Sequence, residues 1–278
     1  MSVADKIGVC LPLADTTGPC RYTDKVDAAM RYLGLDMIRT RAPQMDADSW
    51  RFYKAVAAYG YRFLFTHRPG RDPTLEVRDI AEFNRLFPGS VIAYEGPNEP
   101  DLNPVTFGGI TDTRRVGSTW TGKAALALMQ AQRVALRNVS ALNSVRIVAF
   151  NDWMQASQSP FTNLANSHIY PNNEVLIDRL PGFEKLIAQH GRGQGVITEW
   201  GYHNKIGSKQ TSVGISEAEA ARNYAADISA ILVNPKIFYA FIYCGVDGYG
   251  TGEFDRFGLF RSDWTPKPAA DALARMRQ

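Results

Sequence analysis

Short apolar runs alternate along the chain with longer segments in which apolar residues recur at helical spacing. The short runs are rich in β-branched and aromatic residues, which favour strands. Several are apolar at almost every position, as is typical of strands that are buried on both faces. Eight strands are predicted in this way, at 7–13, 37–42, 61–67, 91–95, 145–150, 166–170, 195–200 and 238–244.

The segments between these strands have the period of amphipathic helices. Ser216 followed by Glu219 forms a capping box at the start of one helix. Asp48 is a suitable N-cap for another, and Pro181 is tolerated in a first helical turn and places a helix start there. The predicted helices are 24–33, 48–59, 74–86, 121–139, 181–190, 216–233 and 266–277.

The alternation of strands and helices predicts an α/β fold with a parallel sheet and right-handed crossovers. Eight such units favour a single (β/α)8 TIM barrel, and this length is ordinary for a one-domain barrel, so 1–278 is expected to form one domain. An open doubly wound sheet is the alternative. It usually carries a glycine-rich phosphate turn after the first strand, and the turn at 13–18 has no such motif.

The composition fits a globular domain, with 45% hydrophobic and 21% charged residues in a chain of 278. The net charge is only +3, and the basic residues are scattered, so no nucleic-acid partner is expected. No apolar run approaches the ~20 residues of a membrane span, which argues against a membrane partner. We expect a monomer.

The three cysteines and the N-terminus leave alternatives open. Cys10 and Cys20 either bridge across the first loop or remain as buried reduced thiols, and Cys244 makes the count odd. No cysteine has metal-ligand spacing. Residues 1–6 contain no signal-peptide core, so the protein is cytoplasmic, or is secreted or periplasmic if Met1 replaces a removed leader.

Two carboxylates follow different predicted strands. In a (β/α)8 barrel the active site lies where the carboxyl ends of the strands meet the following loops. Glu99 follows the strand 91–95, and Glu199 lies at the end of the strand 195–200. Hydrolysis of a glycosidic bond needs such a pair, one group to protonate the leaving oxygen and one to attack the anomeric carbon.

These segments also resemble a known superfamily. The run Gly96-Pro97-Asn98-Glu99-Pro100 resembles the Asn-Glu-Pro element of clan A glycoside hydrolases, which include families five and thirty-nine. The segment 197–201 is similar to the nucleophile segment of that clan, and 257–260 and 263–269 are similar to the passage that closes many of its barrels. The resemblance implies a retaining mechanism in which Glu99 is the acid/base and Glu199 is the nucleophile.

The resemblance extends to further candidate substrate-binding residues. Arg39 matches an arginine near the nucleophile, and Asn98 would donate to the sugar 2-hydroxyl. The clan's strand-six His-x-Tyr element reads His168-Ile169-Tyr170 here, so His168 and Tyr170 are expected near the carboxylates. Arg41 shares a strand face with Arg39 and either reaches inward or forms an ion pair at the rim. His67 at the end of the third strand lines the cleft or is structural.

Aromatic side chains at the rim are expected to stack on the apolar faces of sugars. The clan often places a tryptophan at strand eight, whereas this chain offers Phe241, Tyr243 and Gly245, so the central subsite departs from the pattern. The long loop 101–120 is expected to form a wall of the cleft. The aromatic candidates are Trp153, Trp200, Tyr202 and Tyr243.

The predicted function is hydrolysis of a β-linked oligo- or polysaccharide by double displacement. Cleavage within the polysaccharide chain is favoured, because large insertions that would close the cleft are missing. No metal or cofactor is expected. Transglycosylation on the same two glutamates is an alternative, and a non-catalytic carbohydrate-binding barrel is another. A lyase acting on uronic acids is weaker, since no clear motif supplies its base.

Overall fold

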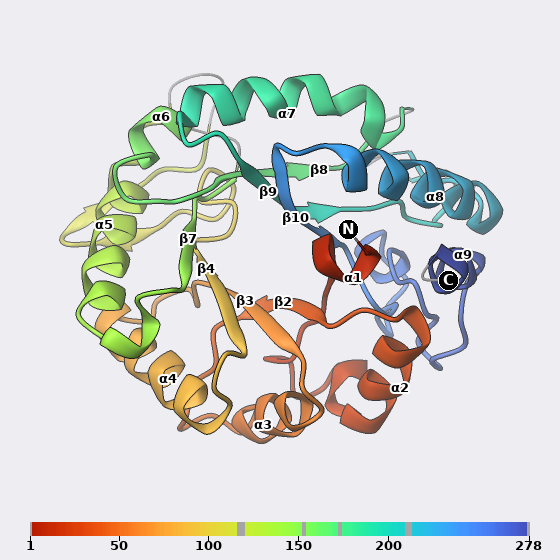
Figure 1. Cartoon of the computed structure of the whole chain (residues 1–278), viewed down its shortest axis with the longest axis horizontal. Coiled ribbons are helices and arrows are strands. Elements are labelled where there is room, and N and C mark those ends of the chain that lie inside the picture. Colours follow the sequence, from red (N-terminus) through yellow and green to blue (C-terminus); the bar gives the residue numbers. More distant parts are fainter. Residues whose placement is uncertain (1, 116–119, 152–153, 172–173, 209–212, 277–278) are drawn as a thin grey trace.

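Eight parallel strands form a nearly closed barrel, which confirms the predicted (β/α)8 fold (Figure 1). The computed structural model describes residues 2–115, 120–151, 154–171, 174–208 and 213–276. Around the ring the strand order is β7, β4, β3, β2, β1, β10, β9, β8, and a bridge between Val148 and Leu164 joins its two ends. The barrel strands are β1 (Ile7–Cys10), β2 (Met37–Arg41), β3 (Arg62–Thr66), β4 (Val91–Glu95), β7 (Arg146–Val148), β8 (Ala165–Ile169), β9 (Gly195–Trp200) and β10 (Ile237–Ile242).

Helices surround the barrel, and α2 to α8 each lie in the chain between two barrel strands, whereas α1 precedes β1 and α9 follows β10 (Figure 1). Every predicted helix is found, and Ser216 caps its helix by accepting a hydrogen bond from the backbone N–H of Glu219 (3.2 Å). None of the described helices is long and apolar enough to cross a membrane. The α-helices are α1 (Val3–Lys6), α2 (Thr23–Leu33), α3 (Trp50–Ala58), α4 (Pro73–Leu86), α5 (Lys123–Arg137), α6 (Gln155–Gln158), α7 (Leu176–His190), α8 (Glu217–Val233) and α9 (Pro268–Met276).

Two predicted helix starts are wrong. Helix α7 begins at Leu176, so Pro181 lies inside it and does not open it. The apolar stripe of α7 already starts at Leu176 and continues through Leu180 and Phe183, and burial of this stripe outweighs the hydrogen bond that the proline removes. Helix α3 begins at Trp50 after Ser49, and Asp48 therefore lies outside the cap position.

The core has two layers. Inside the barrel, inward-facing side chains such as Met37, Leu64 and Phe241 pack together, and outside it a larger cluster lies between the strands and the helices. All three cysteines are buried and free, so Cys10 and Cys20 are not bridged. Alternation along the strands therefore decides whether most side chains face the barrel interior or the helices, and β9 departs from it where its pairing register shifts near Glu199.

The predicted wall loop contains a short hairpin, β5 (Thr106–Phe107) and β6 (Ile110–Thr111). Asp112, directly after the hairpin, accepts hydrogen bonds from the backbone N–H groups of Ala124 (3.0 Å) and Ala125 (2.9 Å). These two groups lie in the first turn of α5, where backbone donors have no partner within the helix. The loop is thus fastened to the helix that follows it.

Candidate active site

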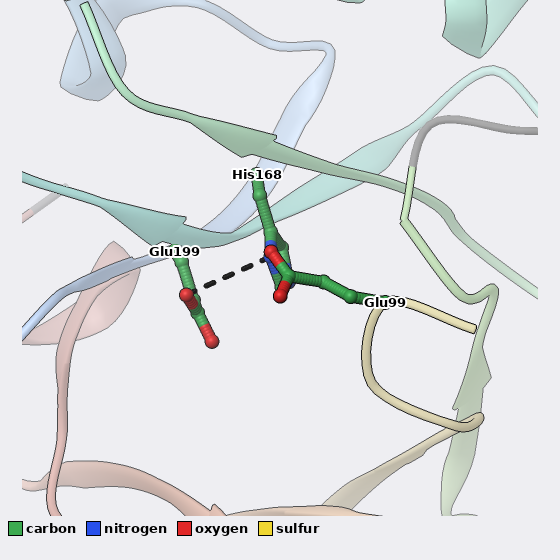
Figure 2. Close-up of side chains that lie close together, drawn as sticks. All are labelled: Glu99, His168 and Glu199. Carbon is green, nitrogen blue, oxygen red and sulfur yellow. Dashed lines mark hydrogen bonds and ion pairs between the residues drawn. The ribbon is translucent and has the colours of Figure 1, made fainter. Parts of the chain in front are cut away.

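Glu99, His168 and Glu199 meet at the carboxyl ends of β4, β8 and β9 (Figure 2). The imidazole Nδ1 of His168 lies 2.9 Å from Oε1 of Glu99 and 3.6 Å from Oε2 of Glu199. One side-chain atom of each residue lies within 4.8 Å of the other two. Two carboxylates that are distant in the sequence are therefore close neighbours in space.

Arg39 fixes one side of this cluster. Its position on β2 points it into the barrel, where its side chain is only 5% exposed. Nη1 donates to Oε1 of Glu199 (2.6 Å), and Nη2 donates to Oδ1 of Asn98 (2.7 Å). One planar guanidinium thus aligns the strand-nine glutamate with the residue that precedes Glu99.

Glu95 is a third carboxylate of the site, which the sequence analysis missed. It accepts a bidentate pair from Arg39, with Nε at 2.6 Å and Nη2 at 3.0 Å. Asn166 and Thr198 also donate to its Oε1 (3.0 and 3.2 Å). Complete burial raises its pKa, but the positive charge of Arg39 and the hydrogen bonds to Glu95 together outweigh burial, and the pKa falls to about 2. Its signal was its inward position at the end of β4, two residues beyond the buried Ala93.

Tyr170 holds the second oxygen of Glu199. Its hydroxyl donates to Oε2, while Arg39 donates to Oε1, so each oxygen of this carboxylate has a fixed donor. Burial and the neighbouring charge of Glu199 raise the pKa of Tyr170 well above its usual value, so it stays protonated as a donor. The orientation of Glu199 is therefore set before any substrate binds.

The proton in the cluster is on His168. Burial lowers the pKa of His168, but the charge of Glu199 raises it, and the carboxylates of Glu95 and Glu99 add to that effect. The pKa reaches about 10. Burial raises the pKa of Glu99, but the hydrogen bond and charge of His168 lower it below its usual value. An ionised Glu99 and a protonated His168 thus share one proton across 2.9 Å.

The backbone of Glu99 is also specialised. Its φ of 46° lies in the left-handed region, which is uncommon for a residue with a side chain. Its N–H donates to Oδ1 of Asn151 (3.0 Å), a residue of the β7 loop that the sequence analysis did not single out. The side chain of Glu99 is 25% exposed, against 9% for Glu199. Glu99 is therefore the member of the pair that is more open to solvent.

Tyr243 borders the site directly after the end of β10. Its ring makes edge contacts with Tyr170 (centroids 6.0 Å apart) and with Phe257 (5.4 Å). Phe257 also contacts Tyr170 (5.4 Å) and was not predicted as a site residue. Tyr243 is only partly buried, and it stands where the resemblance led us to look for a tryptophan.

Trp200 and Tyr202, two predicted stacking residues, are corrected by the structure. Trp200 has no exposed surface and packs against Tyr224 in the outer layer, because it follows the inward-facing Glu199 on the same strand. Tyr202 is 4% exposed, and its hydroxyl donates to Oδ2 of Asp227 (2.6 Å). Neither ring can lie on a sugar.

The structure places His67, whereas it does not describe Trp153, and both are predicted substrate-binding residues. His67 is 4% exposed, and its Nδ1 pairs with Oε1 of Glu76 on α4 (2.9 Å), which joins it to the layer between strands and helices. Its contact with substrate stays a prediction. Trp153 lies outside the described residues.

Comparison with known proteins supports the fold. The sequence matches no known family model and no curated protein. Solved structures of similar shape include a family 2 β-galacturonidase from Eisenbergiella tayi bound to galacturonate, with a TM-score of 0.70 and 14% identity over 99% of this chain and 51% of that one. A family 39 glycoside hydrolase from Bacteroides cellulosilyticus WH2 gives 0.65 and 14% over 99% and 64%. A β-glucuronidase from Lactobacillus rhamnosus gives 0.64 and 16% over 92% and 46%.

The chain spans between about half and two thirds of the length of these three structures. It shares a barrel with these glycoside hydrolases over nearly its whole length, so the comparison agrees with the (β/α)8 fold. At 14–16% identity this likeness shows the fold alone.

Proposed function

We propose that the protein is a retaining glycoside hydrolase of β-linked sugars, with Glu99 as acid/base and Glu199 as nucleophile. The observation that carries the proposal is the close approach of the two carboxylates, with one oxygen of each within 4.8 Å. In retaining glycosidases the two carboxyl groups are about 5–5.5 Å apart, whereas inverting enzymes leave about 6.5–9.5 Å for a water. The spacing favours direct attack by Glu199 on the sugar.

In the first step Glu199 attacks the anomeric carbon, and the bond from that carbon to the leaving oxygen breaks. The leaving oxygen takes a proton from Glu99, which draws on the proton that it shares with His168. The product is an ester between Glu199 and the sugar. Arg39 and Tyr170 each hold one oxygen of Glu199, so the carboxylate meets the sugar in a single orientation.

In the second step Glu99 acts as a base. As a carboxylate it takes a proton from water while the water oxygen attacks the anomeric carbon, and the bond to Glu199 breaks. The same side chain thus serves as acid and then as base, and a second inversion restores the original configuration. Glu99 is suited to this role because it is the more exposed carboxylate of the pair.

Asn98 supports sugar binding in this proposal. Its Oδ1 accepts a hydrogen bond from Arg39, so its amide NH₂ is left to donate to a ligand. A donor beside the nucleophile suits the sugar 2-hydroxyl, whose hydrogen bond strengthens in the transition state. Tyr243, directly after β10, offers a ring for the apolar face of the sugar.

The proposed substrate is a β-linked oligo- or polysaccharide, cleaved within the chain. The β-galacturonidase and β-glucuronidase that share this fold are named for β-linked sugars, which agrees with the proposed linkage. A panel of polysaccharides, with product sizes read by mass spectrometry, separates internal cleavage from release at chain ends. It also separates hydrolysis from transglycosylation, which yields products longer than the substrate.

The stereochemical outcome tests the mechanism. Proton NMR early in the hydrolysis of a β-linked substrate should show the β-anomer first, with the α-anomer appearing only by mutarotation. An α-anomer as first product would reject the role given to Glu199. A total absence of cleavage and of glycosyl transfer would favour the carbohydrate-binding barrel instead.

A further inference from the structure

Arg41 is a charged group of the barrel mouth that the proposed reaction leaves unused. It is the last residue of β2 and lies two positions after Arg39, so the two side chains leave the same face of the strand. Two residues of strand advance the chain by roughly 6.6 Å. Arg39 is buried at the catalytic carboxylates, whereas Arg41 is exposed one layer nearer the mouth.

The two arginines differ in their partners. The guanidinium of Arg39 contacts two carboxylates, those of Glu95 and Glu199. Among the residues that the structure describes, the guanidinium of Arg41 has neither an ion pair nor a hydrogen bond. The ion pair at the rim that the sequence left open for Arg41 is therefore not found in the described chain. Its charge is available to a ligand.

A second guanidinium lies at the same corner of the mouth. The strand register pairs Arg41 with Thr66 on β3, and Arg68 follows two residues later. Arg68 donates through Nε (3.2 Å) and Nη2 (2.8 Å) to the carbonyl of Ala42, the neighbour of Arg41. Among the described side chains, no carboxylate pairs with the guanidinium of Arg68. This corner thus combines an anchored positive charge with a free one.

The negative charge of the carboxylate cluster determines what the two arginines at this corner could do. Three carboxylates, Glu95, Glu99 and Glu199, face only two cationic groups there. An anionic sugar would be repelled by that excess unless a positive charge met its acid group. Charge complementarity of this kind selects between ligands more than it adds raw affinity.

We propose that Arg41 binds an acid group carried by the sugar, so that the substrates are acidic glycans. The inference rests on the proposed function and names its substrate class. The planar fork of arginine matches a carboxylate or a sulfate ester through two parallel hydrogen bonds. A uronic acid and a sulfated sugar present the same chemistry to this corner, and the choice of substrates separates them.

The test compares acidic and neutral substrates of the same configuration. Values of kcat/KM are measured for the 4-nitrophenyl β-glucuronide, the β-glucoside and the 6-sulfated β-glucoside, and for the matching galacto-configured compounds. The wild type should prefer an acidic member of each set. Arg41→Gln should lower the ratio of acidic to neutral kcat/KM by about ten- to one hundred-fold, as expected for a lost charged hydrogen bond. Arg41→Lys should retain part of the preference.

The matched control is Arg51→Gln, which removes an exposed arginine from α3, the helix after β2. It should leave the ratio unchanged. In the wild type the preference should also weaken as salt is added, because an exposed charge pair is screened. A higher kcat/KM on the neutral sugar, or an equal fall on both substrates in Arg41→Gln, would overturn the inference. A preference for the sulfated sugar alone would support the anion site and reject the uronic acid as its ligand.

A binding measurement separates this inference from the proposed function. In a Glu199→Gln background, titration calorimetry with a uronate oligosaccharide and its neutral analogue reads affinity without turnover. Tighter binding of the acidic ligand, lost on adding Arg41→Gln, would support the anion site even if no substrate were cleaved. Cleavage that depends on Glu99 and Glu199 but shows no acidic preference would uphold the function and reject the role of Arg41.

Discussion

A histidine pairs with a glutamate at the same distance in two places in this barrel. At the mouth, Nδ1 of His168 lies 2.9 Å from Glu99, and a tyrosine, Tyr170, donates to the neighbouring Glu199. Behind β3 and β4, Nδ1 of His67 lies 2.9 Å from Glu76, and a tyrosine again donates to the carboxylate. The histidine–glutamate distance is the same in the two clusters, and each cluster has a tyrosine that donates to a carboxylate.

The surroundings of the two clusters differ. Glu76 is fully buried, and both of its oxygens have partners, since Oε1 accepts from Tyr94 and faces His67 while Oε2 accepts from the N–H of Arg68 (2.9 Å). The mouth cluster instead brings three carboxylates around one imidazole and leaves the side chain of Glu99 25% exposed. Like charges gathered in a cluster that is partly open to solvent are costly for folding and useful for proton transfer. A buried histidine–glutamate pair alone does not mark an active site.

The largest expected effect comes from removing the nucleophile. Glu199→Gln preserves shape and should lower kcat by more than about 10⁴-fold, because no covalent intermediate can form. Glu76→Gln makes the same change in the enclosed cluster and should lower the melting temperature while kcat stays within about threefold. Steady-state kinetics and thermal unfolding of both variants measure the contrast. A large loss of kcat in Glu76→Gln would bring His67 into the working site.

The acid/base should show a loss that depends on the leaving group. Glu99→Ala should slow cleavage of a natural glycoside by about 10²–10⁴-fold, the usual contribution of general acid catalysis. An activated aryl glycoside needs no protonation, so it should still form the ester. Added azide should then release a β-glycosyl azide, which NMR identifies. Equal losses on both substrates, without rescue by azide, would remove Glu99 from this role.

The shared proton should appear in the pH dependence. In the free protein it resides on His168, whose pKa is raised to about 10, so the alkaline limb of kcat/KM should lie at high pH. In His168→Gln the proton remains on Glu99 alone, and the limb should move to lower pH by at least about one unit. His67→Gln removes the enclosed imidazole and should leave the limb in place. An unmoved limb in His168→Gln would show that the proton is not shared.

The smallest effect concerns stability in acid. The pKa of Glu95 in the folded protein is about 2, below its ordinary value of 4.5, so folding favours its ionised form. Its contribution is present above pH 4.5 and is lost as the pH falls towards 2, because unfolding then takes up a proton. Urea unfolding of the wild type between pH 6 and pH 3 should show this loss. Glu95→Gln should flatten part of that slope, and an identical slope would contradict the assignment.

The sequence predicts the strands and helices of the barrel well, because the spacing of apolar residues within each segment is a local property of the sequence. Every predicted barrel strand overlaps an observed one, from 7–13 with β1 to 238–244 with β10. The start of α7 was misplaced because a proline is allowed at more than one helical position, and only the packed stripe from Leu176 decides between them. The start of a helix that is decided by packing cannot be predicted from one residue type alone.

The candidate site is predicted less evenly. The structure brings Arg39, Asn98, His168 and Tyr170 together with the two glutamates, as expected from motifs at strand ends. Trp200 and Tyr202 fail because closeness to Glu199 in the sequence does not place a side chain on the face that Glu199 occupies. Glu95 and Asn151 were missed because each contacts the site through a residue that is distant in the sequence. No local sequence pattern reveals such a contact.

The ring of strands closes at the seam between β7 and β8. Val148 bridges Leu164 there, and the N–H of Ala149 donates to the carbonyl of Leu164 (3.0 Å). Glu99 lies on the β7 side of this seam, and His168 and Glu199 lie on the β8 side. The amide of Asn166 spans the gap, donating to the carbonyl of Ala149 (2.8 Å) and to Glu95 (3.0 Å). Regions with few backbone pairings open most readily in native proteins. Local opening at this seam would separate Glu99 from His168 and Glu199, so we expect the arrangement of these three side chains to depend on how well β7 and β8 stay paired.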